Sequence, residues 1–144
     1  MNKKVLWAAA AAAALVLILM IRSVSDSPES TDFAYHVLLA DPEKYKGGAY
    51  TESFVISAGS YEFRFIPNGD SPRTLSIQLA GESFLFSEDF ELEGTPHRTQ
   101  FSEYFTWDYT GDRGFVLDSG QDLEIMIDPN GNTVGTVSVM IVRP

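Results

Sequence analysis

FVISAGSYEFRFIPNGDSPRTLSIQL, residues 54–79, decides the fold, because a diverged copy, FVLDSGQDLEIMIDPNGNTVGTVSVMI, returns at residues 115–141. The two copies share Phe-Val at their start and Pro-Asn-Gly near their middle. Each copy has the pattern of three strands separated by two turns, with apolar and polar residues alternating along the strands. The chain is therefore expected to contain an internally duplicated, all-β domain.

The alternation within the copies predicts which side chains form the core. Phe63 and Phe65 alternate with Glu62 and Arg64, which is the period of two typical of a half-buried strand. Extending this register to the other strands predicts a set of inward-facing residues: Phe63, Phe65, Leu75, Ile77, Leu79, Ile125, Ile127, Val137, Val139 and Ile141. Proline fixes its own φ and Asn-Gly accepts positive φ, so both Pro-Asn-Gly segments are interpreted as hairpin turns.

Outside the copies, the sequence predicts further short strands. FAYHVLL at residues 33–39 alternates like a strand, with a short helix beginning near Asp32 as the alternative. Residues 80–114 are not duplicated, and three strands are expected there, around residues 84–86, 90–92 and 104–109. Roughly eight to ten strands suffice for two facing sheets, so we expect an antiparallel β-sandwich of jelly-roll-like arrangement.

The sequence of the N-terminal segment predicts an export signal that is not cleaved and remains as a membrane anchor. An unbroken apolar run from Val5 to Ile21 follows Lys3 and Lys4 and ends at Arg22. At ~1.5 Å per residue it spans about 25 Å, close to the ~30 Å hydrocarbon core. Residues 1–22 are therefore expected to be a cytoplasmic lysine head and a transmembrane signal-anchor helix, by the positive-inside rule.

The remaining chain divides into a linker and one domain. Residues 23–32 are small and polar and are interpreted as a linker, and residues 33–144 as the extracytoplasmic domain of a single-pass protein of the cell membrane. The alternative is cleavage after Ser25, because Ser23-Val24-Ser25 has the small-x-small form that a signal peptidase accepts. In both cases the domain is exported.

Composition excludes several classes of function. All 20 acidic residues follow Arg22, and removing Lys3, Lys4 and Arg22 from the ten basic residues leaves seven, so this part has a net charge of −13. Such a field disfavours nucleic acid and favours basic partners or simple solubility. The chain has no cysteine, so it contains neither disulfides nor thiol chemistry.

The most aromatic stretch, FSEYFTWDY at residues 101–109, carries the candidate ligand site. Phe105, Trp107 and Tyr109 share one face of a strand, and one of the two faces is expected to join the core. With that face buried, Tyr104 beside Asp108 and Glu103 would form an aromatic platform flanked by hydrogen-bond acceptors, which suits a sugar ring. Ordinary sandwich packing is the competing interpretation.

Metal binding and catalysis have weaker support. The side chains of Asp128, Asn130 and Asn132 offer oxygens of the kind calcium prefers, although their spacing is not that of an EF-hand loop and the turn alone explains Pro129 and Gly131. The chain has two histidines and no nucleophile-elbow or phosphate-loop motif. We therefore predict no catalytic residues, no metal, no cofactor and no enzymatic activity.

Two resemblances bear on function. The Lys-Lys head, apolar helix and β-rich domain resemble archaeal pilins and archaellins in layout, although VLWAAAA lacks the acidic residue usual near the start of their helix. ADPEKYKGG, FVISAGSYEFRFIPNGDSP, GTPH and FTWDY resemble small anchored exported proteins of ammonia-oxidising archaea, which implies an anchored β-sandwich. The expected role is binding or structural, in a membrane or envelope complex, with a glycan-binding module and a pilin-like filament subunit as alternatives. A protein partner or an envelope polymer is expected, and the oligomeric state stays open.

Overall fold

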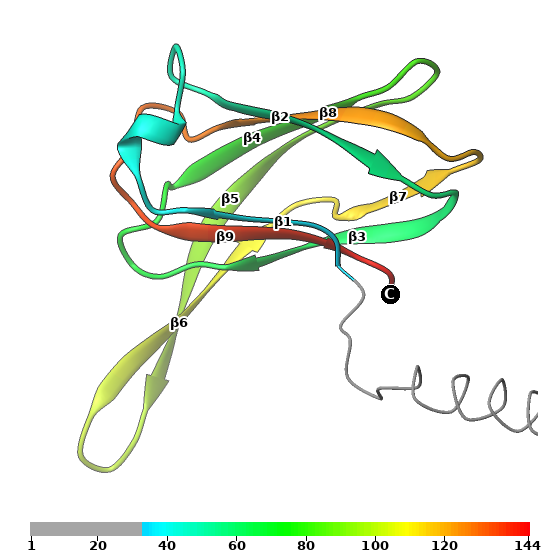
Figure 1. Cartoon of the computed structure of the whole chain (residues 1–144). Coiled ribbons are helices and arrows are strands. Elements are labelled where there is room, and N and C mark those ends of the chain that lie inside the picture. Colours follow the sequence, from blue (N-terminus) through cyan, green and yellow to red (C-terminus); the bar gives the residue numbers. More distant parts are fainter. Residues whose placement is uncertain (1–32) are drawn as a thin grey trace, which may run out of the picture. The chain divides into compact units, whose positions relative to one another are not determined.

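The computed structural model describes residues 33–144, which are entirely β apart from one 3-10 turn (Figure 1). The predicted anchor and linker, residues 1–32, lie outside the described residues. Within residues 33–144, no helix has the length and apolar character needed to cross a bilayer. The elements are β1 (Phe33–Leu39), η1 (Pro42–Lys44), β2 (Tyr50–Ile56), β3 (Gly59–Ile66), β4 (Thr74–Ala80), β5 (Leu85–Arg98), β6 (Glu103–Thr110), β7 (Gly114–Leu117), β8 (Gln121–Asp128) and β9 (Val137–Val142).

The strands form two antiparallel sheets that face each other across one core. The four-stranded sheet has the order β1-β9-β3-β7, and the five-stranded sheet has the order β2-β8-β4-β5-β6. Every predicted inward-facing residue is buried, which confirms the strand register read from the alternation. Phe63 lies at the centre, with its ring 5.4 to 6.2 Å from the rings of Phe65, Phe86, Phe90 and Phe115.

The interpretation of the Pro-Asn-Gly segments as hairpin turns is wrong. The first joins β3 to β4 and the second joins β8 to β9, and in each case the two strands belong to different sheets. Asn130 and Gly131 have the expected positive φ, 51° and 93°, whereas neither residue of Asn68-Gly69 does. The chain crosses between sheets because β3 pairs with β9 and β4 pairs with β8, so that consecutive strands of one copy bind strands of the other copy in different sheets.

Strands of the two copies pair with each other through equivalent residues. Phe63 of β3 lies opposite Ile141 of β9, and the equivalent residues Ile125 of β8 and Leu79 of β4 also lie opposite each other. β2 of the first copy pairs with β8 of the second, and the equivalent strand β7 of the second copy pairs with β3 of the first. The two copies therefore interleave, and neither could complete a sheet alone.

The unduplicated segment holds two strands in place of the three predicted. β5 is continuous over 14 residues, and its first half pairs with β4 as far as Glu91. Beyond Glu91, β5 has only β6 as a neighbour. No break occurs near residue 88 because Phe86 and Phe90 alternate inward through that region while Ser87, Asp89 and Glu91 alternate outward.

Candidate functional site

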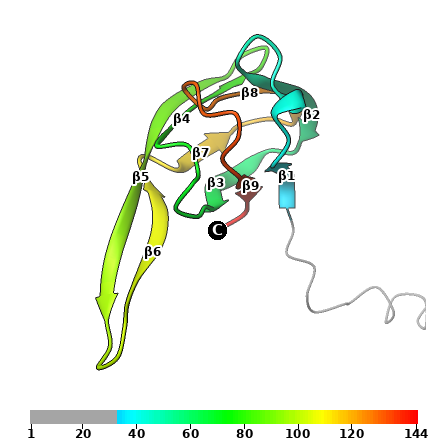
Figure 2. The same cartoon turned by 90° about the vertical axis from the view of Figure 1, so that its left-hand side faces the viewer.

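The feature that stands out from the sandwich is the far half of the β5–β6 hairpin, residues 93–108, which we call the arm. Figures 1 and 2 show the arm extending well past both sheets in two perpendicular views. Six acidic residues and one arginine lie in residues 85–110, which contain the whole hairpin. The arm falls within the unduplicated segment where the aromatic and acidic residues concentrate.

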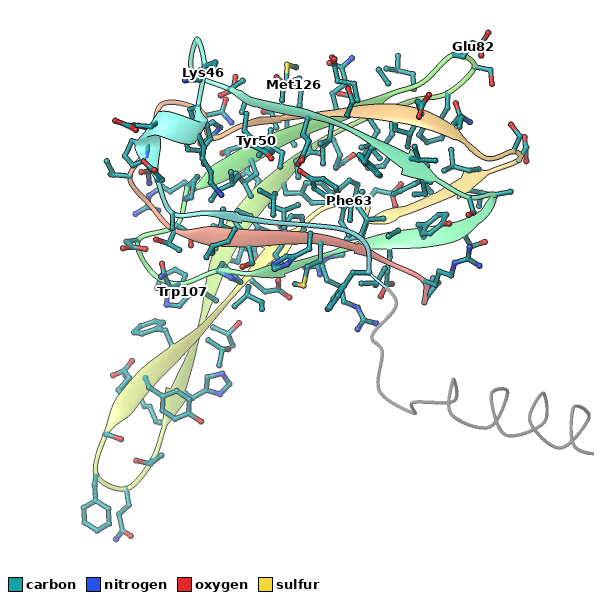
Figure 3. The ribbon with its side chains drawn as sticks, viewed as in Figure 1. Lys46, Tyr50, Phe63, Glu82, Trp107 and Met126 are labelled. Atoms are coloured by element: carbon teal, nitrogen blue, oxygen red, sulfur yellow. The ribbon has the colours of Figure 1, made fainter. Side chains whose placement is uncertain are left out.

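Trp107 fixes the base of the arm to the sandwich (Figure 3). Its ring lies directly over Gly94 on β5, where an added Cβ would be 2.7 Å from Cζ3 of the ring. The same ring lies against Gly69 of the first Pro-Asn-Gly turn, 3.4 Å from the place of an added Cβ. The Trp107 ring can contact the backbone at position 94 only because glycine has no Cβ.

The predicted trio of Tyr104, Asp108 and Glu103 does not share one face of β6. Alternation puts Tyr104 and Asp108 on one side of the arm, and Glu103 on the other side with Phe105. Glu103 forms a 3.6 Å ion pair with Arg98, its cross-strand partner. The structure therefore places two of the three predicted residues on one side of β6, four positions apart with Thr106 between them.

Both residues on the Tyr104 side have partners within the protein. Tyr104 is half exposed and stacks on His97, with ring centroids 5.0 Å apart and planes 17° from parallel. His97 Nε2 lies 2.8 Å from Thr106 Oγ1. Asp108 Oδ1 accepts hydrogen bonds from the Arg113 guanidinium at 2.9 Å and from the Tyr109 backbone N–H at 2.8 Å.

The opposite side of the arm carries exposed aromatic side chains beside the Arg98–Glu103 ion pair. Phe105 is 50% exposed and lies 5.9 Å from Trp107, with the two rings 29° from parallel. Phe101, in the turn at the tip, is 93% exposed. Of Phe105, Trp107 and Tyr109, the face whose burial the Tyr104 platform assumed, only Tyr109 joins the core, and its hydroxyl donates a 2.6 Å hydrogen bond to the Pro72 carbonyl. Phe105 stays exposed because the arm extends past the four-stranded sheet, so nothing covers it.

β6 is also an open edge. It ends the five-stranded sheet, and among residues 33–144 it pairs only with β5. Every second residue of an edge strand directs its N–H and C=O away from the sheet, where another strand can pair with them. The sequence of this edge, EYFTWDYT, contains no proline and no lysine of the kind that blocks such pairing.

The side chains of Asp128, Asn130 and Asn132, which were considered as calcium ligands, form hydrogen bonds in and around their own turn. Asp128 Oδ1 accepts the Asn130 backbone N–H at 2.8 Å, and Asn130 Nδ2 donates to the Thr74 carbonyl at 3.0 Å. Asn132 Oδ1 accepts the Gly135 N–H at 2.9 Å, while its Nδ2 donates to the Asp70 carbonyl at 3.1 Å. These bonds tie the second Pro-Asn-Gly turn to β4 and to the first turn. Among residues 33–144, no three histidine or acidic side chains are grouped closely enough to hold a metal.

A second exposed apolar surface lies on the outer face of the four-stranded sheet. Leu38 of β1 and Ile66 of β3 flank Ser138 of β9 in one cross-strand row, and they are 47% and 64% exposed. Val116 on β7 adds a further exposed side chain to this face. The outer face of β8, in contrast, carries Asp122 and Glu124, both exposed.

The exposed aromatic face of the arm is the feature that sequence reasoning missed. Its signal was present in β5, where the segment EGTPHR at residues 93–98 has no large apolar side chain to continue the core. A strand paired with such a segment cannot bury its own aromatic residues in a shared core. Comparison of the chain with protein-family models, curated proteins and solved structures finds no match.

Proposed function

We propose that this protein is a membrane-anchored, extracytoplasmic binding subunit that contacts a partner protein through the arm, as part of a membrane or envelope complex. The observation that carries the proposal is the position of Phe101 and Phe105, exposed on a hairpin that extends past a core already complete without them. Monomeric soluble proteins rarely leave such clustered aromatic residues in water unless they meet another molecule. The role is a non-catalytic one, with neither metal nor cofactor.

The sheet order supports treating the arm as an addition to the fold. We infer a jelly roll in which eight strands, all except β6, form two interleaved four-stranded sheets. The internal duplication covers β2 to β4 and β7 to β9, and the arm lies between the two copies. An element outside both the duplication and the eight strands is free to serve recognition.

The exported location of the domain is part of the proposal and comes from the sequence. The lysine head and apolar run at residues 1–22 anchor the chain with its amino terminus in the cytoplasm, and residues 23–32 link it to the domain. The exposed apolar row of Leu38 and Ile66 on the outer face of the four-stranded sheet supports a further contact within a complex.

Glycan binding is the second candidate. The favouring observation is the half-exposed ring of Phe105, which lies beside the ring of Trp107 on the same side of the arm. Aromatic faces of this kind stack on sugar rings when hydrogen-bonding groups flank them. Tyr104 is less suited than the sequence suggested, because one face of its ring is stacked on His97.

Co-purification from the native membrane tests the proposal. The full chain carrying Phe101→Ser and Phe105→Ser should lose a partner protein that the unaltered chain retains, because both side chains are exposed and the core does not use them. Val55→Ser, an exposed position on β2 at the opposite edge of the five-stranded sheet from β6, is the matched control and should retain the partner. Retention by the double variant would contradict the proposal, and a glycan array hit abolished by Phe105→Ser would favour the second candidate.

A further inference from the structure

We infer that the open edge of β6 binds an extended segment of a partner protein as an added strand, and that this segment alternates basic and apolar side chains. This inference rests on the proposed binding role of the arm and names the chemistry of its partner. Three observations carry it: the unpaired edge, the different chemistry of the two sides of the arm, and the excess of carboxylates.

The edge supplies the backbone complementarity. β6 has eight residues, and β5 is its only neighbour among residues 33–144. Within β6 the Tyr109 N–H and C=O are already bound by Asp108 and Arg113, which leaves the edge from Glu103 to Trp107. Hydrogen bonds between main chains require no particular sequence in the added strand, so an extended peptide of about five to seven residues would pair along this edge. Phe101 at the tip and Trp107 at the base mark the two ends of the surface available to it.

The two sides of the arm determine the side chains of the added strand. An added strand alternates like its neighbour, so one set of its side chains lies beside Tyr104, Thr106 and Asp108, and the other beside Phe105 and Trp107. The first side also includes Glu93 and Glu91, which project outward from β5. Basic residues suit that side, and apolar residues suit the side of Phe105 and Trp107.

Charge favours a basic partner over a second copy of this chain. Residues 85–110 carry six carboxylates; Glu103 pairs with Arg98 and Asp108 with Arg113, and within residues 33–144 this leaves Glu88, Asp89, Glu91 and Glu93 without an ion pair. Pairing β6 with β6 of another copy would bring two such acidic hairpins together, whereas a lysine- or arginine-bearing strand is attracted to them. Within the arm, Arg98 already has Glu103 as its partner.

A set of three synthetic peptides tests strand addition on the full chain in detergent. The first alternates lysine and valine over seven residues; the second and third carry backbone N-methyl groups on all lysines or on all valines, respectively. An added strand directs N–H groups of only one parity toward β6, so one methylated peptide should bind at least tenfold more weakly than the first, and the other should bind about equally. Fluorescence anisotropy of dye-labelled peptides measures this difference.

Charge variants supply the matched control. Glu93→Gln, on the outward side of the arm, should weaken binding of the unmethylated peptide severalfold. Glu82→Gln, in the distant β4–β5 turn, should leave binding unchanged (Figure 3). Equal binding of all three peptides, or equal loss in both variants, would overturn strand addition in favour of unspecific charge attraction.

A second copy as the occupant would also overturn the inference. In that case the chain would show concentration-dependent dimerisation, abolished by Phe105→Ser, and no binding of the unmethylated peptide. The proposed function is tested separately by co-purification. If strand addition is wrong but the arm still binds a partner, the partner is still lost from the variant with Phe101→Ser and Phe105→Ser.

Discussion

Single side chains join the two sheets at the side of the sandwich where β1 and β2 lie. The Tyr35 hydroxyl of β1 and the Tyr50 hydroxyl of β2 both donate to Glu52 Oε2, at 2.8 and 2.6 Å. The hydrogen bonds from Tyr50 and Tyr35 hold the pKa of Glu52 below its ordinary 4.5, while burial raises the pKa of Tyr35. Since β1 and β2 belong to different sheets, one carboxylate links the sheets.

Glu52→Gln should lower the free energy of unfolding by about 1 kcal/mol at pH 7, because a charged acceptor of two hydroxyl groups becomes a neutral one. A carboxylate whose pKa is lowered on folding stabilises the fold above its ordinary pKa, and this contribution is lost as the pH falls below 4.5. The difference between the two proteins should therefore shrink below pH 4.5. Urea unfolding at pH 7 and at lower pH measures this difference.

The matched control is Glu124→Gln, an exposed glutamate on the outer face of β8. It should change stability by less than about 0.5 kcal/mol at either pH. A Glu52→Gln effect of the same size at all pH values would show that the carboxylate's charge does not contribute.

Among the elements, the β5–β6 hairpin depends on one close contact. Trp107 of β6 packs on the bare backbone of Gly94 in β5 and on Gly69 of the first Pro-Asn-Gly turn. This contact holds the base of the arm while Phe105 and Phe101 farther out stay exposed. The arm is therefore expected to open more readily than the sandwich that carries it.

Gly94→Ala should displace Trp107, because the new Cβ would lie 2.7 Å from the ring. We expect a loss of about 1 to 3 kcal/mol and faster amide hydrogen exchange confined to residues 93–108. Gly114→Ala is the control, since nothing lies within 4 Å of its added Cβ and its φ is not positive. Unchanged exchange in the arm of Gly94→Ala would show that Trp107 does not hold the hairpin.

The elements also show what the sequence could and could not predict. Alternation located the strands and the buried faces, because burial of one face is a local property recorded in each strand. The pairing of strands is not a local property, because Phe63 pairs with Ile141, far along the chain. A Pro-Asn-Gly segment can form a hairpin turn or a crossing between sheets, so its sequence did not distinguish the two. Phe105 is exposed because the four-stranded sheet ends before it could cover this residue. The extent of that sheet cannot be read from the sequence of β6.

At the scale of the whole molecule, an internally duplicated sandwich carries one addition that lies outside the duplication. The duplicated strands interleave to bury the core, and the predicted Tyr104, Asp108 and Glu103 all lie on the addition, divided between its two sides. The acidic charge of the domain would disfavour contact between copies and favour basic segments. We therefore propose that the sandwich supplies stability and the arm recognition.

Site-specific photo-crosslinking in native membranes tests this assignment most directly. A benzophenone side chain replaces Phe105 on the arm in one protein and Val55 on β2, at the opposite edge of the five-stranded sheet, in another, both exposed positions. We predict a discrete crosslinked protein from position 105 that is missing from position 55. No crosslink from position 105, or the same product from both positions, would contradict the claim that the arm is the binding element.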